Sequence, residues 1–196
     1  MRFMLIRTLF FALALIPTIL MAQSRRIDTT MKVGKAGYRI NCYNKSSKKN
    51  PISIYPIGFE SEARDFNFEL KGILTGTEVD DLNKDGFPDL LLYVASFDSL
   101  NKSSVIAISS QENKSVAPIV FPDILDDPRL RDGYKGADKY MLLEGILMRT
   151  YPLYEKDASG VQQPTGKMRR LMYRVAPGEQ GTQKFVVSRF YDFQKK

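Results

Sequence analysis

The sharpest chemical pattern in the sequence is a run of oxygen-bearing side chains ahead of an apolar segment. The run has the side chains and the spacing that open a calcium-binding loop, namely Asp81, Asn83, Asp85 and Gly86. Leu92 stands at the twelfth position, where such a loop carries a bidentate glutamate, so Asp89 would have to close a shorter loop. The alternative is a polar turn whose Asp and Asn side chains bond backbone amides. The sequence therefore predicts either a calcium site at Asp81, Asn83, Asp85 and Asp89 or a turn of the same residues.

Two further polar segments carry groups that could bind a partner. The first, residues 96–104, joins two apolar runs and contains Ser99, Asn101, Lys102, Ser103 and Ser104. In the second, the sequence Pro164-Thr165-Gly166 predicts a rigid turn, and Arg169 and Arg170 follow it. Guanidinium groups presented by such a turn can bond carboxylates of a partner. A solvated hairpin loop and a plain charged surface are the respective alternatives.

The residue types that are missing exclude several kinds of catalysis. The chain has no histidine, which removes the commonest general base, the histidine-based triads and the commonest zinc ligand. Its one cysteine, Cys42, rules out an internal disulfide framework. Cys42 alternates with Tyr38 and Ile40 on one face of a strand-like segment, so we expect a buried thiol rather than an intermolecular disulfide. We therefore expect a protein that is not an enzyme.

The first residues have the order of a secretory signal. Arg2 and Arg7 lie in a basic start, an apolar run covers residues 9–20, and Ala22 precedes a polar stretch. The run is shorter than a membrane-spanning helix, which needs about 20 apolar residues. We expect cleavage near Ala22 and a periplasmic or secreted product that meets the membrane only during export.

Cleavage would leave a basic chain of about 174 residues, a length that fits one domain. Removal of Arg2 and Arg7, and of no acidic residue, lowers the formal charge from +7 to +5. The basic residues are spread along the chain, and aromatic residues do not interleave with the clusters at 45–49 and 169–170. This pattern indicates solvated faces and no nucleic-acid partner.

The elements that must position these residues are short strands. Residues 23–37 are polar and aperiodic, so we expect a flexible lead-in followed by a single domain over 38–196. Strand-like runs cover 38–43, 52–57, 66–70, 90–96, 105–109, 140–151, 171–175 and 185–190. Glu144-Gly145 would form a hairpin turn inside 140–151, and 123–130 could form one helical turn. The predicted fold is all-β, an antiparallel β-sandwich or small barrel of about eight strands.

Several short motifs follow one another along the chain in a distinctive order. They are Thr75–Asp89 (TGTEVDDLNKDGFPD), Leu92–Ser96 (LYVAS), Gly133–Asp138 (GYKGAD), Met148–Tyr154 (MRTYPLY), Pro164–Gly166 (PTG) and Arg169 through Tyr173 to Gly178-Glu179. Each stretch is short, but their shared order resembles that of the periplasmic inhibitors of invertebrate-type lysozyme. The resemblance runs from about Tyr38 to Glu179.

The resemblance implies an all-β inhibitor, expected to be a homodimer, that inserts a polar loop into the active-site cleft of lysozyme. The loop of that family is rich in serine and glycine and includes a tyrosine, whereas the matching positions here read Ser99-Leu-Asn-Lys-Ser-Ser104. The family also uses an arginine after its Pro-Ser/Thr-Gly turn, and Arg169 occupies that place, with Arg170 beside it. The rival expectation is an exported calcium-binding or adhesion-type β module.

Overall fold

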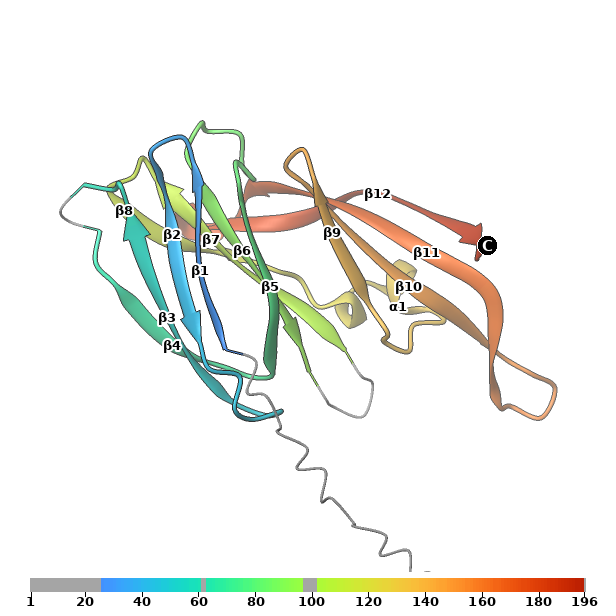
Figure 1. Ribbon diagram of the computed structural model, residues 1–196. Helices are drawn as coiled ribbons and strands as arrows, with labels where there is room; N and C mark the ends of the chain where they lie inside the picture. Colours follow the sequence, from blue (N-terminus) through green and yellow to red (C-terminus); the bar gives the residue numbers. More distant parts are fainter. Residues whose placement is uncertain (1–25, 61–62, 97–101, 196) are drawn as a thin grey trace, which may run out of the picture.

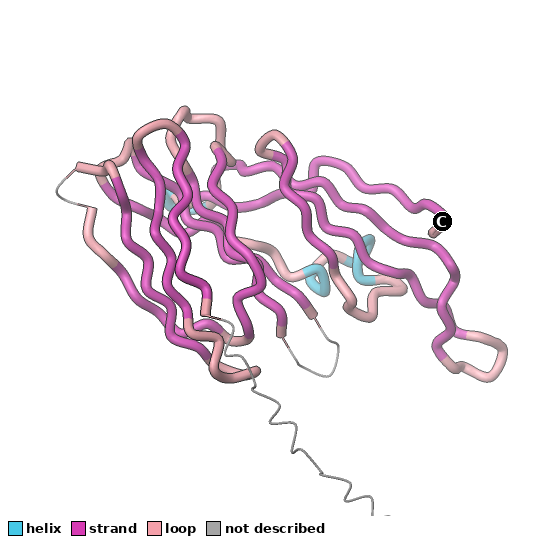
Figure 2. The backbone as a smooth tube through the Cα atoms, viewed as in Figure 1, coloured by secondary structure: helices cyan, strands magenta, loops and turns pink. Residues whose placement is uncertain are grey.

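The computed structural model describes residues 26–60, 63–96 and 102–195 (Figure 1). Twelve strands account for most of the described residues, and the helical turns among them are short (Figure 2). The elements are β1 Ile27–Val33, β2 Ala36–Cys42, β3 Asn50–Ile57, β4 Phe66–Leu70, β5 Ile73–Asp80, β6 Asp89–Ala95, β7 Ser103–Gln111, β8 Ser115–Val120, η1 Ile124–Asp126, α1 Pro128–Arg131, β9 Lys139–Leu143, β10 Ile146–Lys156, β11 Gln162–Pro177, η2 Glu179–Gly181 and β12 Gln183–Gln194. The all-β prediction is confirmed.

The strands form two sheets. A four-stranded sheet has the order β1-β2-β3-β4, and an eight-stranded sheet has the order β5-β6-β7-β8-β12-β11-β10-β9. Neighbouring strands are antiparallel except for β8 and β12, which pair in parallel through Ile119 and Val120. The eight-stranded sheet curls until it is nearly closed. Its two edges meet where the Gly145 amide donates to Asp80 Oδ2 at 2.9 Å, so the β9–β10 hairpin is tied to the end of β5.

Strand β6 separates two apolar cores because its side chains point alternately to its two faces. Leu90, Leu92 and Val94 pack against the four-stranded sheet, around Tyr38, Ile40 and Cys42. Leu91 and Tyr93 point into the curled sheet. That interior is filled by aromatic and aliphatic side chains of β7 and β8, of β10 to β12 and of the short helices. A strand buried on both faces explains why residues 90–94 are continuously apolar.

The strands predicted from alternation are present, whereas several strands with polar sequences were missed. Residues 27–33 form β1, so the prediction of a flexible segment over 23–37 is wrong for this stretch. Strand β5 was missed as well. Both β1 and β5 are edge strands that contain threonine and acidic residues, and an edge strand needs only a few apolar contacts. β8 was also missed. The count of about eight strands was therefore too low, although the eight-stranded sheet alone has that number.

Two local predictions are confirmed. Glu144 and Gly145 both have positive φ, 50° and 73°, and form the two-residue turn between β9 and β10. Asp123 and Asp127 cap η1 and α1, so the helical turn expected over 123–130 is present as two short pieces. No helix in the described ranges is long and apolar enough to cross a membrane. The predicted export signal lies outside the described residues.

Candidate functional site

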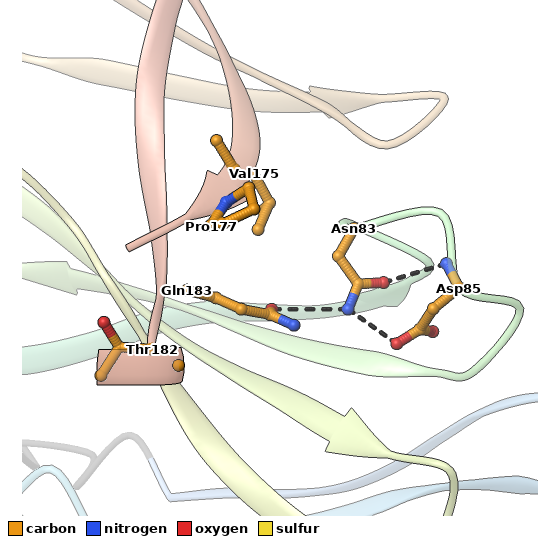
Figure 3. A pocket seen from close by; sticks show the side chains of 8 residues that line it. Asn83, Asp85, Val175, Pro177, Thr182 and Gln183 are labelled. Atoms are coloured by element: carbon orange, nitrogen blue, oxygen red, sulfur yellow. Dashed lines mark hydrogen bonds between the residues drawn. The ribbon is translucent and has the colours of Figure 1, made fainter. Parts of the chain in front are cut away.

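The segment from Asp81 to Asp89 forms a tight polar loop between β5 and β6, held together by side chain to backbone hydrogen bonds. The Asp81 carboxylate accepts from the amides of Asp85 at 3.0 Å and Gly86 at 2.9 Å. Asn83 Oδ1 also accepts from the Asp85 amide, and Asn83 Nδ2 donates to Asp85 Oδ2 at 2.7 Å (Figure 3). These are the bonds of the polar turn that the sequence offered as one of two alternatives.

Asp89 anchors this loop from inside the protein. Its side chain is buried and accepts from the amides of Leu82 at 3.0 Å and Ser110 at 2.9 Å. Burial raises the pKa of Asp89 to about 6, although the bonds from Ser110 and Leu82 act in the opposite direction. Asp89 therefore joins the loop to β7, which lies on the other side of β6.

The described residues contain no group of three or more His, Cys, Asp or Glu side chains placed to hold a metal ion. The oxygens of Asp81 and Asn83 that a calcium ion would need are engaged with backbone amides of the same loop. Calcium binding at Asp81, Asn83, Asp85 and Asp89 stays a prediction.

Next to the loop is a cavity of about 360 Å³, which lies between the loop and the segment formed by the end of β11, η2 and the start of β12. Figure 3 shows Asn83 and Asp85 on one side and Gln183 and Thr182 on the other. Asn83 Nδ2 lies 3.4 Å from Gln183 Oε1, so the loop also contacts the start of β12. Neither the sequence patterns nor the resemblance pointed to Thr182 or Gln183.

The other polar segment predicted to bind a partner joins β6 to β7. Ser99 and Asn101 lie outside the described residues, whereas Lys102, Ser103 and Ser104 are described. The Ser96 amide donates to the Lys102 carbonyl at 2.9 Å, which closes the end of the hairpin. Tyr140 from β9 donates its hydroxyl hydrogen to the Ser103 carbonyl at 3.0 Å. The start of β7 is therefore fixed to a strand from the opposite edge of the sheet.

A second cavity, of about 270 Å³, opens beside this point. Its lining comes from four separate stretches of the chain: Thr75, Gly76, Tyr93, Val94, Ser103, Ser104, Asp138 and Tyr140. Tyr93 and Tyr140 are 6.4 Å apart between ring centroids, and Tyr93 donates to Glu78 at 2.7 Å. The wall of the cavity is thus aromatic and hydrogen-bonded.

Asp138, one of the residues that line this cavity, belongs to a buried ion pair. Arg149 Nε donates to Asp138 Oδ1 at 2.8 Å, and both side chains are almost fully buried. Tyr134 completes the group, since its hydroxyl donates to Asp138 at 2.7 Å and accepts from Arg149 at 2.9 Å. Sequence reasoning missed Arg149, because a lone arginine in an apolar strand gives no sign of its distant partner.

Arg169 and Arg170 are neighbours on β11 and therefore point to opposite faces of the sheet. Arg169 forms a two-point ion pair with Asp192 of β12 and also donates to the carbonyl of Arg129 at 3.0 Å. Arg170 donates to Thr150 Oγ1 at 3.2 Å and stacks over Phe193. In the described part of the chain, neither arginine contacts Ser103 or Ser104. In the described residues, the predicted partner-binding residues at 102–104 and the two arginines are thus not in contact with one another.

The prediction of a rigid turn at Pro164-Thr165-Gly166 is wrong. These residues lie within strand β11, opposite β10, at an irregularity where the pairing passes from Pro152 and Met168 to Tyr154 and Pro164. Gly166 has φ 76°, a conformation that glycine adopts without strain, and Thr165 donates to the Leu153 carbonyl at 3.0 Å. The segment is therefore an irregularity within a strand and not a turn between two elements, because the pairing with β10 continues on both sides of it.

No protein-family model matches this chain, and no curated protein matches it. The groups described at the β6–β7 connection are hydrogen-bond donors and acceptors, namely Lys102 and, at the start of β7, Ser103 and Ser104. Such a site can hold a polar surface of a partner.

Proposed function

We propose that this chain is an exported, non-catalytic inhibitor of lysozyme, of the invertebrate type, that occupies the enzyme's cleft with the connection between β6 and β7. The proposal starts from the ordered set of motifs that resemble the inhibitor family. It adds one observation about where those motifs lie in the fold.

That observation is the convergence of three matching stretches at the base of the β6–β7 connection. Thr75 and Gly76 from the first stretch, Tyr93 and Val94 from the second, and Asp138 from the third line the cavity of about 270 Å³ beside Ser103 and Ser104. Residues that are far apart in sequence thus form the support for the segment assigned to the enzyme cleft. A rigid support favours binding because less conformational freedom is lost when the complex forms.

The chemistry of the connection suits a glycosidase cleft. Lysozyme carries paired carboxyl groups there, and these accept hydrogen bonds. An ammonium group at Lys102 and hydroxyl groups at Ser103 and Ser104 are donors of the matching kind. Because binding alone blocks the cleft, the chain needs no catalytic residue of its own.

In this proposal Arg169 has a structural role and does not contact the enzyme. Its side chain is only 13% exposed, and its guanidinium bonds Asp192 and the Arg129 carbonyl, so it holds β11, β12 and α1 together. We assign it to positioning and assign the contact with the enzyme to the β6–β7 connection.

The test is a lysis assay with the purified mature protein, peptidoglycan cell walls and an invertebrate-type lysozyme. We expect lysis to stop at a near-stoichiometric ratio of inhibitor to enzyme. Lys102→Glu should weaken inhibition by about tenfold or more, because it places a carboxylate against the carboxylates of the cleft. Lys32→Glu makes the same change of charge on an exposed residue of β1, in the four-stranded sheet, and should leave inhibition unchanged. Absence of inhibition at a micromolar excess of the wild-type protein contradicts the proposal.

A calcium-binding β module is the second candidate. It rests on the side-chain oxygens gathered in the Asp81–Asp85 turn, which a calcium ion would have to take over from the backbone amides that they bind here. Calorimetry with calcium separates the two functions. Heat of binding together with a raised melting temperature would support the module. If millimolar calcium produces neither heat of binding nor a raised melting temperature, the module is excluded.

A further inference from the structure

The outer face of β9 to β12 is not covered by the second sheet. The four-stranded sheet packs on β5, β6 and β7, and the core that it shares with them includes no residue of β9 to β12. Figure 1 shows the same division, with β1 to β4 lying across one half of the curled sheet and β9 to β12 forming the other half. One large sheet surface therefore faces away from both cores.

This outer face is rich in methionine. The described residues include five methionines, and Met141, Met148, Met168 and Met172 occupy outward positions on β9, β10 and β11. Met148 is paired in register with both Met141 and Met172, so three of the side chains form a row across the strands, in which the central Met148 is itself buried. Met141 is 49% exposed, and Leu143, on the same face of β9, is 56% exposed. Methionine is common at binding surfaces because its thioether is flexible and polarisable.

The same face is cationic and has no acidic residue at an outward position of these strands. The outward register of β9, β11 and β12 carries five basic side chains: Lys139, Arg170, Arg174, Lys184 and Arg189. None of the five forms a salt bridge within the described ranges. Arg169, on the opposite face, is by contrast fully paired.

Aromatic rings hold two of these arginines in place. Arg170 lies over Phe193 with 5.1 Å to the ring centroid, and Arg189 lies over Tyr191 at 5.7 Å. The two rings contact each other at 6.0 Å. Arg170 also donates from Nε to Thr150 Oγ1 at 3.2 Å and from Nη1 to the Tyr191 hydroxyl at 3.4 Å. Stacking leaves the remaining guanidinium N–H groups of the two arginines at the ring edge, where they can donate to phosphate or carboxylate.

We propose that the outer face of β9 to β12 binds the surface of an anionic lipid bilayer. Its excess of positive charge is complementary to phosphate headgroups, and each basic residue near such a surface contributes attraction. The apolar side chains that project most, Met141 and Leu143, are on the edge strand β9, where they can enter the boundary between headgroups and acyl chains.

The arrangement fits a protein partner less well. Protein interfaces place apolar anchors at the centre and charges at the rim, whereas here Arg170 and Arg174 lie on β11, between the neighbouring strands, and the exposed apolar residues lie at the edge. A second copy of the chain is disfavoured because two faces with the same positive charge repel each other. The proposal does not rest on lysozyme inhibition, which uses a different part of the molecule.

The experiment is co-sedimentation of the full mature protein with vesicles of phosphatidylglycerol mixed with phosphatidylcholine, compared with phosphatidylcholine alone. We expect salt-sensitive binding to the anionic vesicles only. Arg174→Glu combined with Arg189→Glu should weaken binding by about thirtyfold or more, since each basic residue contributes about a fivefold factor. Both residues are exposed, so folding should be retained. The matched control, Lys32→Glu with Lys71→Glu, makes the same change of charge away from this face, on β1 and in the connection between β4 and β5, and should bind like wild type.

A second variant tests the apolar part of the face. Met141→Asn with Leu143→Asn should also reduce vesicle binding while leaving the melting temperature and lysozyme inhibition unchanged. Equal loss of binding in the Lys32/Lys71 control would overturn the proposal, because it would show attraction by net charge alone. Binding to soluble poly-glutamate but not to anionic vesicles would overturn it in favour of an acidic protein. A dimer that the Arg174/Arg189 variant dissociates would overturn it in favour of a second copy of the chain.

Discussion

Arg169 on β11 and Asp192 on β12 form a two-point ion pair, with Nε to Oδ1 at 2.7 Å and Nη2 to Oδ2 at 2.9 Å. The hydrogen bonds from Arg169 are the main reason that the pKa of Asp192 is lowered. The pair ties the middle of β11 to the end of β12 and, through the Arg129 carbonyl, to α1.

Arg169→Ala should lower the free energy of unfolding by about 1 kcal/mol, since the pair is bidentate but partly exposed. Urea denaturation at neutral pH measures this. The loss should shrink in acid, because a carboxyl with a depressed pKa contributes stability above its unfolded pKa and loses it as the pH falls through its folded pKa. Arg170→Ala is the neighbouring control and should cost less. If Arg169→Ala abolished lysozyme inhibition without loss of stability, the supporting role assigned to Arg169 would be wrong.

Asp89 should make the protein less stable as the pH rises from about 4 to about 6. Its folded-state pKa is about 6 because of burial, against about 3.9 in the unfolded chain. In this window the native state holds more protons than the unfolded state, so raising the pH favours unfolding, by about 1 to 3 kcal/mol in total. Urea denaturation at several pH values tests this. Asp89→Asn cannot titrate and should have a flatter profile; an unchanged slope would assign the effect to another group.

The buried pair of Arg149 and Asp138 should be costly to break from one side. Arg149→Met leaves the Asp138 carboxylate buried without its cation, and we expect a loss of about 3 to 5 kcal/mol. Adding Asp138→Asn removes the stranded charge and should recover part of that loss. Thermal and urea denaturation of both variants give the comparison. A double variant less stable than Arg149→Met would show that the charge itself is not the cause.

The turn between β9 and β10 offers a stabilising change. Glu144 has φ 50°, a left-handed conformation that asparagine adopts more readily than glutamate, and Gly145 follows it. Glu144→Asn should raise the free energy of unfolding by about 0.5 kcal/mol. Glu144→Val, with a β-branched side chain, should lower it. The melting temperatures of the two variants should therefore move in opposite directions.

Cys42 should not react with a thiol reagent in the native protein. Its side chain is fully buried, burial raises the pKa of the thiol, and its sulfur donates to Asn44 Oδ1 at 3.4 Å. Thiol titration before and after denaturation checks this, with one thiol appearing only on unfolding. A disulfide-linked dimer on a non-reducing gel would be the contrary result.

Local pattern was sufficient to predict the strand class of this fold. Phe66, Phe68 and Leu70 alternate with polar residues, and Glu144-Gly145 marks a hairpin, because both features depend only on the geometry of neighbouring residues. Pattern failed for β1 and β5, whose polar sequences pair at sheet edges and need little apolar surface. The Asp81–Asp89 loop was identified from its residues, but its two possible uses could not be told apart.

The sequence by itself determined an all-β chain with a buried cysteine and no histidine chemistry, since composition and short-range alternation carry that information. Only the tertiary structure decided what Arg169 and Arg170 do. They are adjacent in sequence, yet one is paired with Asp192 and the other lies on an outer face without acidic residues. The reason is strand geometry: successive side chains point to opposite faces, and the partners on each face are set by long-range register, which no local pattern encodes.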